Sequence, residues 1–177
     1  AGEKPLGEVS LRLEVWPFSL PDTFAMRSNF GSLGRVVTKA GLKPGTPEAN
    51  RLLDDTIDLF LAHRCQPSSL GDIWPKYTPE QGMDDSQSGD RLRTMVQQRH
   101  VNSPALPFPW RDGPDKCRAY MRALAAYLRE QSCLDLGYVY LRDEPNNAEE
   151  YETVRQQGAL LHEADPGIRR MCTEQTK

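Results

Sequence analysis

The feature that most constrains the fold is a short apolar run that ends in two acids. Residues 138–141 read YVYL, and a continuous apolar run of this length is typical of a parallel strand buried on both faces. Asp143 and Glu144 follow almost directly, and Pro145 ends the strand. Enzymes with parallel sheets build their sites at the carboxyl ends of strands, so this position favours a functional pair of carboxylates. Acids also favour helix entrances, and the sequence leaves that ordinary explanation open.

Three stretches carry the signals of helices. Thr46 can cap a helix whose first residue is a proline, and a second helix begins after Pro114 and ends near residue 132. A third begins at Asn147, whose side chain can cap while Glu150 returns the bond. The faces expected to be buried are Leu52, Leu53, Ile57, Phe60 and Leu61 in the first helix, Cys117, Tyr120, Met121, Leu124 and Leu128 in the second, and Tyr151, Val154, Gly158 and Leu161 in the third.

Strands are expected to alternate with these helices. Their expected ranges are 23–31, 63–67, 137–141 and 169–173, with a proline-dense strand or loop over 105–110, and a further helix is expected over 90–100. Such alternation predicts an α/β fold with a parallel sheet, which both an open sheet and a barrel satisfy. The chain is long enough for about five βα units of roughly 30 residues, whereas a closed eight-unit barrel takes about 250 residues.

The N-terminal segment has a different pattern. Val9, Leu11, Leu13 and Val15 alternate with polar residues, which predicts a strand with one buried face. We therefore assign residues 1–21 to the end of a preceding β-sandwich domain and its linker, and residues 22–177 to the α/β domain. The chain begins at Ala1 and shows no signal peptide.

Composition disfavours several classes of function. The formal net charge is -3 with no basic block, so a nucleic-acid partner is not expected. No apolar run approaches the roughly 20 residues that span a bilayer, so membrane insertion is not expected. The four cysteines lack the spacing of a zinc site, and neither a phosphate loop nor a dinucleotide fingerprint occurs.

The adjacency of the two acids favours one mechanism. Glycosidases commonly place two acids about 5 Å or more apart on different strands, whereas sequence neighbours on an extended backbone point to opposite sides. Asp143 and Glu144 fit substrate-assisted hydrolysis better. There, one acid protonates the leaving oxygen and its neighbour holds the sugar's 2-acetamido group, whose carbonyl oxygen attacks the anomeric carbon.

Several short motifs resemble one family. Residues 139–145 (VYLRDEP), a helix around Tyr151, and residues 165–170 (DPGIRR) leading to Thr173 resemble the catalytic core of glycoside hydrolase family 123 and its uncharacterised relatives. Residues 13–21 resemble the join between that family's β-sandwich and its barrel, and residues 63–67 resemble its second-strand motif. The similarity covers most of the chain but is thin between about residues 71 and 114.

The resemblance implies a (β/α)8 TIM barrel, of which the first four to five βα units are present. It implies a hydrolase that removes β-linked N-acetylgalactosamine from a glycan or glycoconjugate, retains configuration through an oxazoline-type intermediate, and needs no cofactor. Glu144 would be the general acid/base and Asp143 would orient the acetamido group. Family members are mostly bacterial and often exported, so a periplasmic, surface or secreted location is expected. We expect this segment alone to be inactive, and a non-catalytic carbohydrate-binding or structural relative is the alternative.

Three further residues are candidates for substrate binding. Arg64, near the expected second strand, could reach a sugar hydroxyl or pair with an acid, and a structural ion pair explains it equally well. Trp74 and Trp110 lie in expected loops above the barrel, where aromatic rings stack on sugars, although packing is the commoner role of such side chains.

Overall fold

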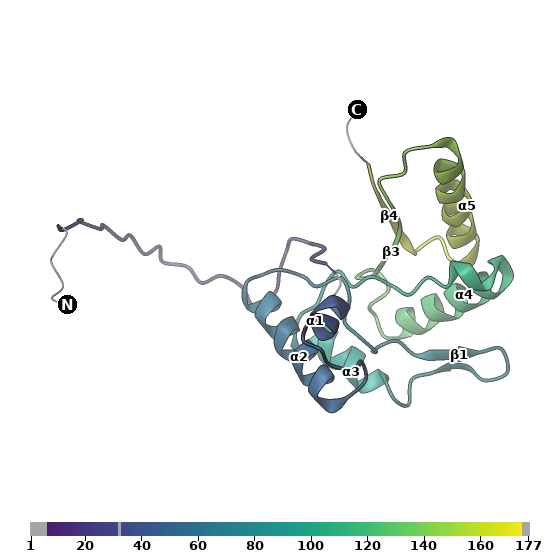
Figure 1. Ribbon diagram of the computed structural model, residues 1–177, viewed down its shortest axis with the longest axis horizontal. Helices are drawn as coiled ribbons and strands as arrows, with labels where there is room; N and C mark the ends of the chain where they lie inside the picture. The colour runs from purple at the N-terminus through teal and green to yellow at the C-terminus, as the bar shows by residue number, and fades with distance from the viewer. Residues whose placement is uncertain (1–6, 32, 175–177) are drawn as a thin grey trace.

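The computed structural model describes residues 7–31 and 33–174. Figure 1 shows a folded body from which the N-terminal segment extends far to one side. The helices are α1 (Gly34–Lys39), α2 (Pro47–Ala62), α3 (Gly89–Arg93), α4 (Pro114–Glu130) and α5 (Ala148–Ala164), with a π-helical turn at Thr94–Gln98 and a 3-10 turn at Trp110–Asp112. The strands are β1 (Lys76–Thr78), β2 (Gly82–Asp84), β3 (Tyr138–Asp143) and β4 (Arg169–Thr173).

The long helices begin where the sequence signals predict. The Thr46 hydroxyl accepts a hydrogen bond from the Ala49 amide at 3.3 Å, and Asn147 Oδ1 accepts one from the Glu150 amide at 3.0 Å. The Glu150 carboxylate accepts its hydrogen bond from the amide of Asn146 rather than from that of Asn147, so this reciprocal bond lies one residue earlier than expected. The three predicted long helices and the helix expected over 90–100 are confirmed in position.

Parallel contacts connect successive segments of the chain. β3 and β4 pair in parallel, Tyr138 forms a parallel bridge with Ala105, and Phe30 forms one with Pro67. The amide of Ala105 donates to the carbonyl of Ser68 at 2.8 Å, which joins the segments around Phe30 and Pro67 to those around Ala105 and β3. These contacts link five segments in chain order, from Phe30 to β4. The described residues form no closed barrel.

Two predicted strands are reduced to single bridges. Only Phe30 of 23–31 and Pro67 of 63–67 take part in one. The strand predicted to begin at His63 is wrong, because the turn that ends α2 occupies residues 63–65. Arg64 has a left-handed φ of 57°, and the amides of Arg64 and Cys65 donate back to the carbonyls of Leu61 and Phe60. These bonds end the helix in a Schellman turn, which occupies the residues predicted to start the strand.

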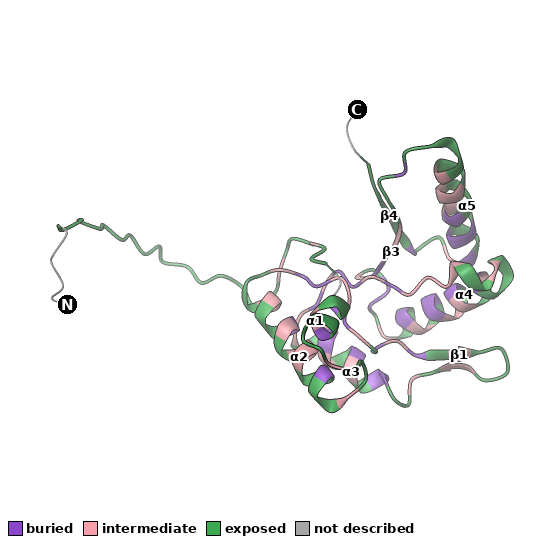
Figure 2. Ribbon diagram, viewed as in Figure 1, coloured by how far each residue is buried: buried purple, intermediate pink, exposed green. Residues whose placement is uncertain are grey.

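The N-terminal segment is extended but pairs with no described strand. Its apolar side chains, such as Val9 at 92% exposure, are exposed to solvent (Figure 2), because no neighbouring strand covers them among the described residues. The strand predicted over 9–15 is therefore not formed, while the assignment of 1–21 to a separate domain stays a prediction and residues 1–6 lie outside the described part.

The core lies between the helices and the parallel segments. Its largest fully buried side chains include Ile57 of α2, Leu92 of α3, Leu124 of α4 and Leu161 of α5. Burial in α5 is confined to its C-terminal half (Figure 2), so the prediction that Tyr151 is buried is wrong. Within the described ranges, no helix has the length and apolar character needed to cross a membrane.

Candidate functional site

A bulge in β3 determines which side chains share its faces. Tyr140 pairs with Met171, the register then shifts, and Asp143 pairs with Thr173. Side chains alternate along a regular strand, so residues three apart would lie on opposite faces. The extra residue of the bulge restores Tyr140 and Asp143 to the same face, which they share with Thr173 on β4.

Tyr140, Asp143 and Thr173 form a close cluster of three oxygens, which we call the hydroxyl–carboxylate triad. Both hydroxyls lie 2.8 Å from Asp143 Oδ1, and the two hydroxyl oxygens lie 2.7 Å apart. The hydrogen bonds from Tyr140 and Thr173 lower the pKa of Asp143, because they stabilise its charged form. Burial, together with the bond to Asp143, raises the pKa of Tyr140, so its hydroxyl stays protonated as a donor.

Glu144 follows in an unusual backbone conformation. It is exposed, its φ is 47°, and its amide donates to the carbonyl of Thr173 at 3.1 Å. A residue other than glycine in the left-handed region costs on the order of 1–3 kcal/mol, and such residues cluster at functional sites. The turn also ends the strand's alternation, so the two acids are not held on opposite faces of an extended chain.

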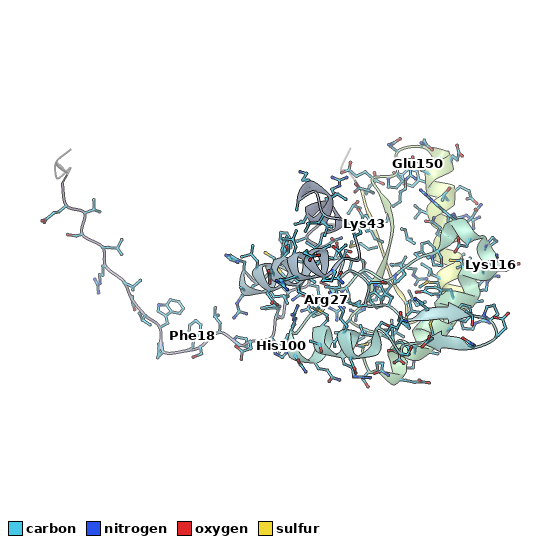
Figure 3. The ribbon with its side chains drawn as sticks, turned by 60° about the horizontal axis from the view of Figure 1, so that its bottom comes forward. Phe18, Arg27, Lys43, His100, Lys116 and Glu150 are labelled. Carbon is cyan, nitrogen blue, oxygen red and sulfur yellow. The ribbon has the colours of Figure 1, made fainter. Side chains whose placement is uncertain are left out.

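The segment after the acids is fixed to α5. Arg142 forms an ion pair with Glu150, and the other carboxylate oxygen of Glu150 accepts a hydrogen bond from the Asn146 amide at 3.0 Å. Figure 3 labels Glu150 at the start of α5. Together with the Asn147 cap, these contacts hold residues 144–147 between the end of β3 and the helix.

Arg64 does not lie with the acids. Its guanidinium donates to the carbonyl of Pro21 at 2.8 Å and lies 5.3 Å from the centroid of the Phe24 ring. Its position in the turn after α2 puts it where the second parallel segment starts, whereas Asp143 lies where β3 ends. The structure therefore attaches Arg64 to the N-terminal segment, and its predicted contact with substrate has no support from the geometry.

Trp74 and Trp110 are half-buried and pack against the hydrophobic core. The Trp110 ring stacks on Phe108, with centroids 6.0 Å apart, and Trp74 lines a cavity of 480 Å³ together with Leu53 and Arg91. Trp74 lies in the loop after Pro67 and Ser68, and Trp110 begins the 3-10 turn that follows Ala105. Their rings already have packing partners, so sugar stacking stays a prediction for both.

A larger cavity, of 760 Å³, lies between the β1–β2 hairpin and the start of α4. Its lining consists of tyrosine, proline and alanine side chains together with Asp112, Asp115 and Lys116, and neither Asp143 nor Glu144 lines it. Figure 3 labels Lys116 on α4. No local sequence motif predicts this cavity, because its wall residues come from three separate segments. The wall residues are Tyr77, Pro79, Pro107, Pro109, Ala119 and Tyr120.

No group of three or more His, Cys, Asp or Glu side chains in the described part of the chain is arranged to hold a metal ion. No protein-family model matches the chain, and no curated protein matches it. The resemblance to glycoside hydrolase family 123 therefore rests on the short motifs alone. The candidate site is the end of β3, where Glu144 follows Asp143 and where the hydroxyl groups of Tyr140 and Thr173 contact the Asp143 carboxylate.

Proposed function

We propose that the chain carries the catalytic pair of a glycoside hydrolase that releases terminal β-linked N-acetylhexosamine, most specifically N-acetylgalactosamine, with retention of configuration. The observation that carries the proposal is the setting of Asp143. It ends a parallel strand, it is exposed, and two hydroxyl groups bind one of its carboxylate oxygens. A charged carboxylate with an oxygen left for substrate is what recognition of an acetamido N–H requires.

The mechanism assigns each acid one role. Asp143 accepts a hydrogen bond from the acetamido N–H and so turns the acetamido carbonyl oxygen toward the anomeric carbon. Glu144 donates a proton to the leaving oxygen as the glycosidic bond breaks and the bond from the carbonyl oxygen forms. Glu144, now ionised, then takes a proton from the water that opens the oxazoline-type intermediate.

We also propose that residues 22–177 are the first four to five βα units of a (β/α)8 barrel. Support comes from the five neighbouring segments, which follow one another in chain order as strands of a singly wound barrel do. In that fold, active sites lie at the carboxyl ends of the strands, which is the location of Asp143 and Glu144.

The test is turnover of p-nitrophenyl N-acetyl-β-galactosaminide by the protein as its gene encodes it. Glu144→Gln is expected to lower kcat/KM by a factor on the order of 10² or more, because general acid–base catalysis contributes about that much. Asp143→Asn should reduce turnover of N-acetylated sugars more than that of sugars without the group. Glu149→Gln is the matched control, since Glu149 lies nearby in the first turn of α5.

Unchanged turnover in Glu144→Gln would exclude the proposed role. The non-catalytic alternative is favoured by one observation, the 760 Å³ cavity with tyrosine and proline walls that lies apart from both acids. Glycan binding that persists in Glu144→Gln, with no release of p-nitrophenol by the wild-type protein, would establish that alternative.

A further inference from the structure

We infer that Tyr140 and Thr173 are positioning residues that keep the Asp143 carboxylate negatively charged and turn its Oδ2 atom toward an N–H donor of the substrate. The assignment of that donor to a 2-acetamido group rests on the proposed function. The inference about charge and orientation rests on the geometry and the exposure of the triad, and does not depend on which substrate binds. Neither residue was singled out for this role by the sequence pattern.

The orientation follows from where the hydrogen bonds fall. Both hydroxyl groups contact Oδ1 of Asp143, each at 2.8 Å. An ionised carboxylate offers about four acceptor sites on two oxygens, so the second oxygen keeps its capacity for another donor. Rotation of the carboxylate would break two bonds at once, and the pair therefore selects one rotamer.

The charge of Asp143 decides how the protons of the triad are shared. The triad has three oxygen contacts, and the two hydroxyl groups supply two protons. With Asp143 ionised, both protons point to the carboxylate, bonds to an ionised acceptor are roughly twice as strong as neutral ones, and the 2.7 Å contact between the two hydroxyl oxygens holds no proton. With Asp143 protonated, a third proton would complete a ring of three neutral bonds. The two arrangements predict opposite effects of removing a hydroxyl, which makes them distinguishable.

Exposure favours the ionised arrangement. Asp143 is exposed, so burial does little to oppose its charge, while Tyr140 is half-buried and keeps its proton. Thr173 has a second function in the backbone, since its carbonyl accepts the bond from the Glu144 amide at 3.1 Å. One residue of β4 therefore holds both acids, Asp143 through its side chain and Glu144 through its main chain.

The experiment is a titration of the Asp143 side-chain carbon by NMR, on protein labelled with ¹³C-aspartate, with Asp143→Asn used to assign the resonance. Tyr140→Phe and Thr173→Val each remove one hydroxyl and keep the shape of the side chain. Both are expected to shift the pKa of Asp143 upward from its wild-type value. Thr173→Ser restores the hydroxyl and should restore the wild-type pKa.

Tyr138→Phe is the matched control. Tyr138 lies on the same strand two residues earlier, and its buried hydroxyl has no hydrogen-bond partner among the described residues. Its loss should leave the titration of Asp143 unchanged. Far-UV circular dichroism of each variant verifies that the fold is retained.

An unchanged pKa in both hydroxyl-deletion variants would overturn the inference, and a downward shift would show that the triad binds the extra proton instead. The titration needs no turnover, so its failure and the failure of the proposed enzyme activity are separate results. If the activity is found, the acid limb of the pH profile of kcat/KM should move to higher pH in Tyr140→Phe and Thr173→Val.

Discussion

Gly137 is the position where β3 and the preceding parallel segment leave no room for a side chain. A Cβ atom built there would lie 2.5 Å from Leu106 Cδ2 and 2.9 Å from its Cγ. The main chain cannot move apart freely, because the Leu106 amide donates to the Tyr138 carbonyl at 2.7 Å and the Tyr138 amide donates to the Pro104 carbonyl at 3.2 Å. Gly137→Ala must therefore displace the buried Leu106 side chain.

The expected cost is the difference between two effects. Overpacking a well-packed core costs about 1–3 kcal/mol, and replacing glycine by alanine recovers about 0.4–1 kcal/mol through the unfolded state. We expect a net loss of about 1–2 kcal/mol in the free energy of unfolding. For urea unfolding with an m value of about 2 kcal/mol/M, the midpoint should fall by about 0.5–1 M. Fluorescence reports the transition, since Trp74 lines the same small apolar cavity as Leu106 and Gly137.

A double-mutant cycle isolates the clash. Leu106→Ala alone should cost about 2–5 kcal/mol, and the double variant should lose less than the sum of the single losses by about 1 kcal/mol or more, because the truncated side chain makes room. Gly158→Ala is the control, since a Cβ there meets nothing within 4 Å, and helix propensity should raise stability by up to about 1 kcal/mol. Full stability of Gly137→Ala, or strict additivity in the cycle, would refute the close pairing of these segments.

Two further predictions concern titratable groups. Burial alone would raise the pKa of Asp165, but hydrogen bonds from Arg129 at 2.6 Å and from the Gly167 amide at 2.8 Å lower this pKa below the ordinary 3.8. The ionised Asp165 side chain therefore stabilises the fold above pH 3.8, and this stabilisation is lost as the pH falls through the folded-state pKa. The Tm of Asp165→Asn should therefore fall less than that of the wild-type protein between about pH 5 and 2, and parallel curves would contradict this. Burial raises the pKa of both Cys117 and Cys133 to about 11, so Ellman's reagent at pH 8 should label exposed Cys172 first and reach the two buried thiols only after unfolding. Rapid reaction of all four thiols in the native protein would contradict the buried positions.

The sequence predicted the elements whose signals are local. The capping residues Thr46 and Asn147 mark the starts of α2 and α5, and the run before Asp143 marks β3. The end of α2 was misjudged, because Arg64 can adopt a left-handed conformation that glycine would have signalled more clearly. The strand predicted over 9–15 is not formed in the described chain, because alternation shows only that a face suits a sheet, not that a sheet covers it.

The candidate site was predictable in part for the same reason. Asp143 and Glu144 follow a recognisable run, so their position at a strand end is confirmed. The hydrogen bond between Asp143 and Tyr140 depends on a one-residue bulge, because strict alternation would place the two side chains on opposite faces of the strand. Thr173 comes from a strand 30 residues further along the chain. Neither the bulge nor the register of β4 has a local sequence signature, so the triad becomes visible only in three dimensions.

Asp143 and Glu144 are proposed to act together on a 2-acetamido sugar. A crystal structure of the protein with a thiazoline inhibitor, which mimics the oxazoline intermediate, tests this proposal. We expect the thiazoline nitrogen within about 2.6–3.2 Å of Asp143 Oδ2, with the Glu144 carboxylate on the side of the leaving group. An inhibitor bound in the cavity of Tyr77 and Tyr120, with no contact to Asp143, would contradict it.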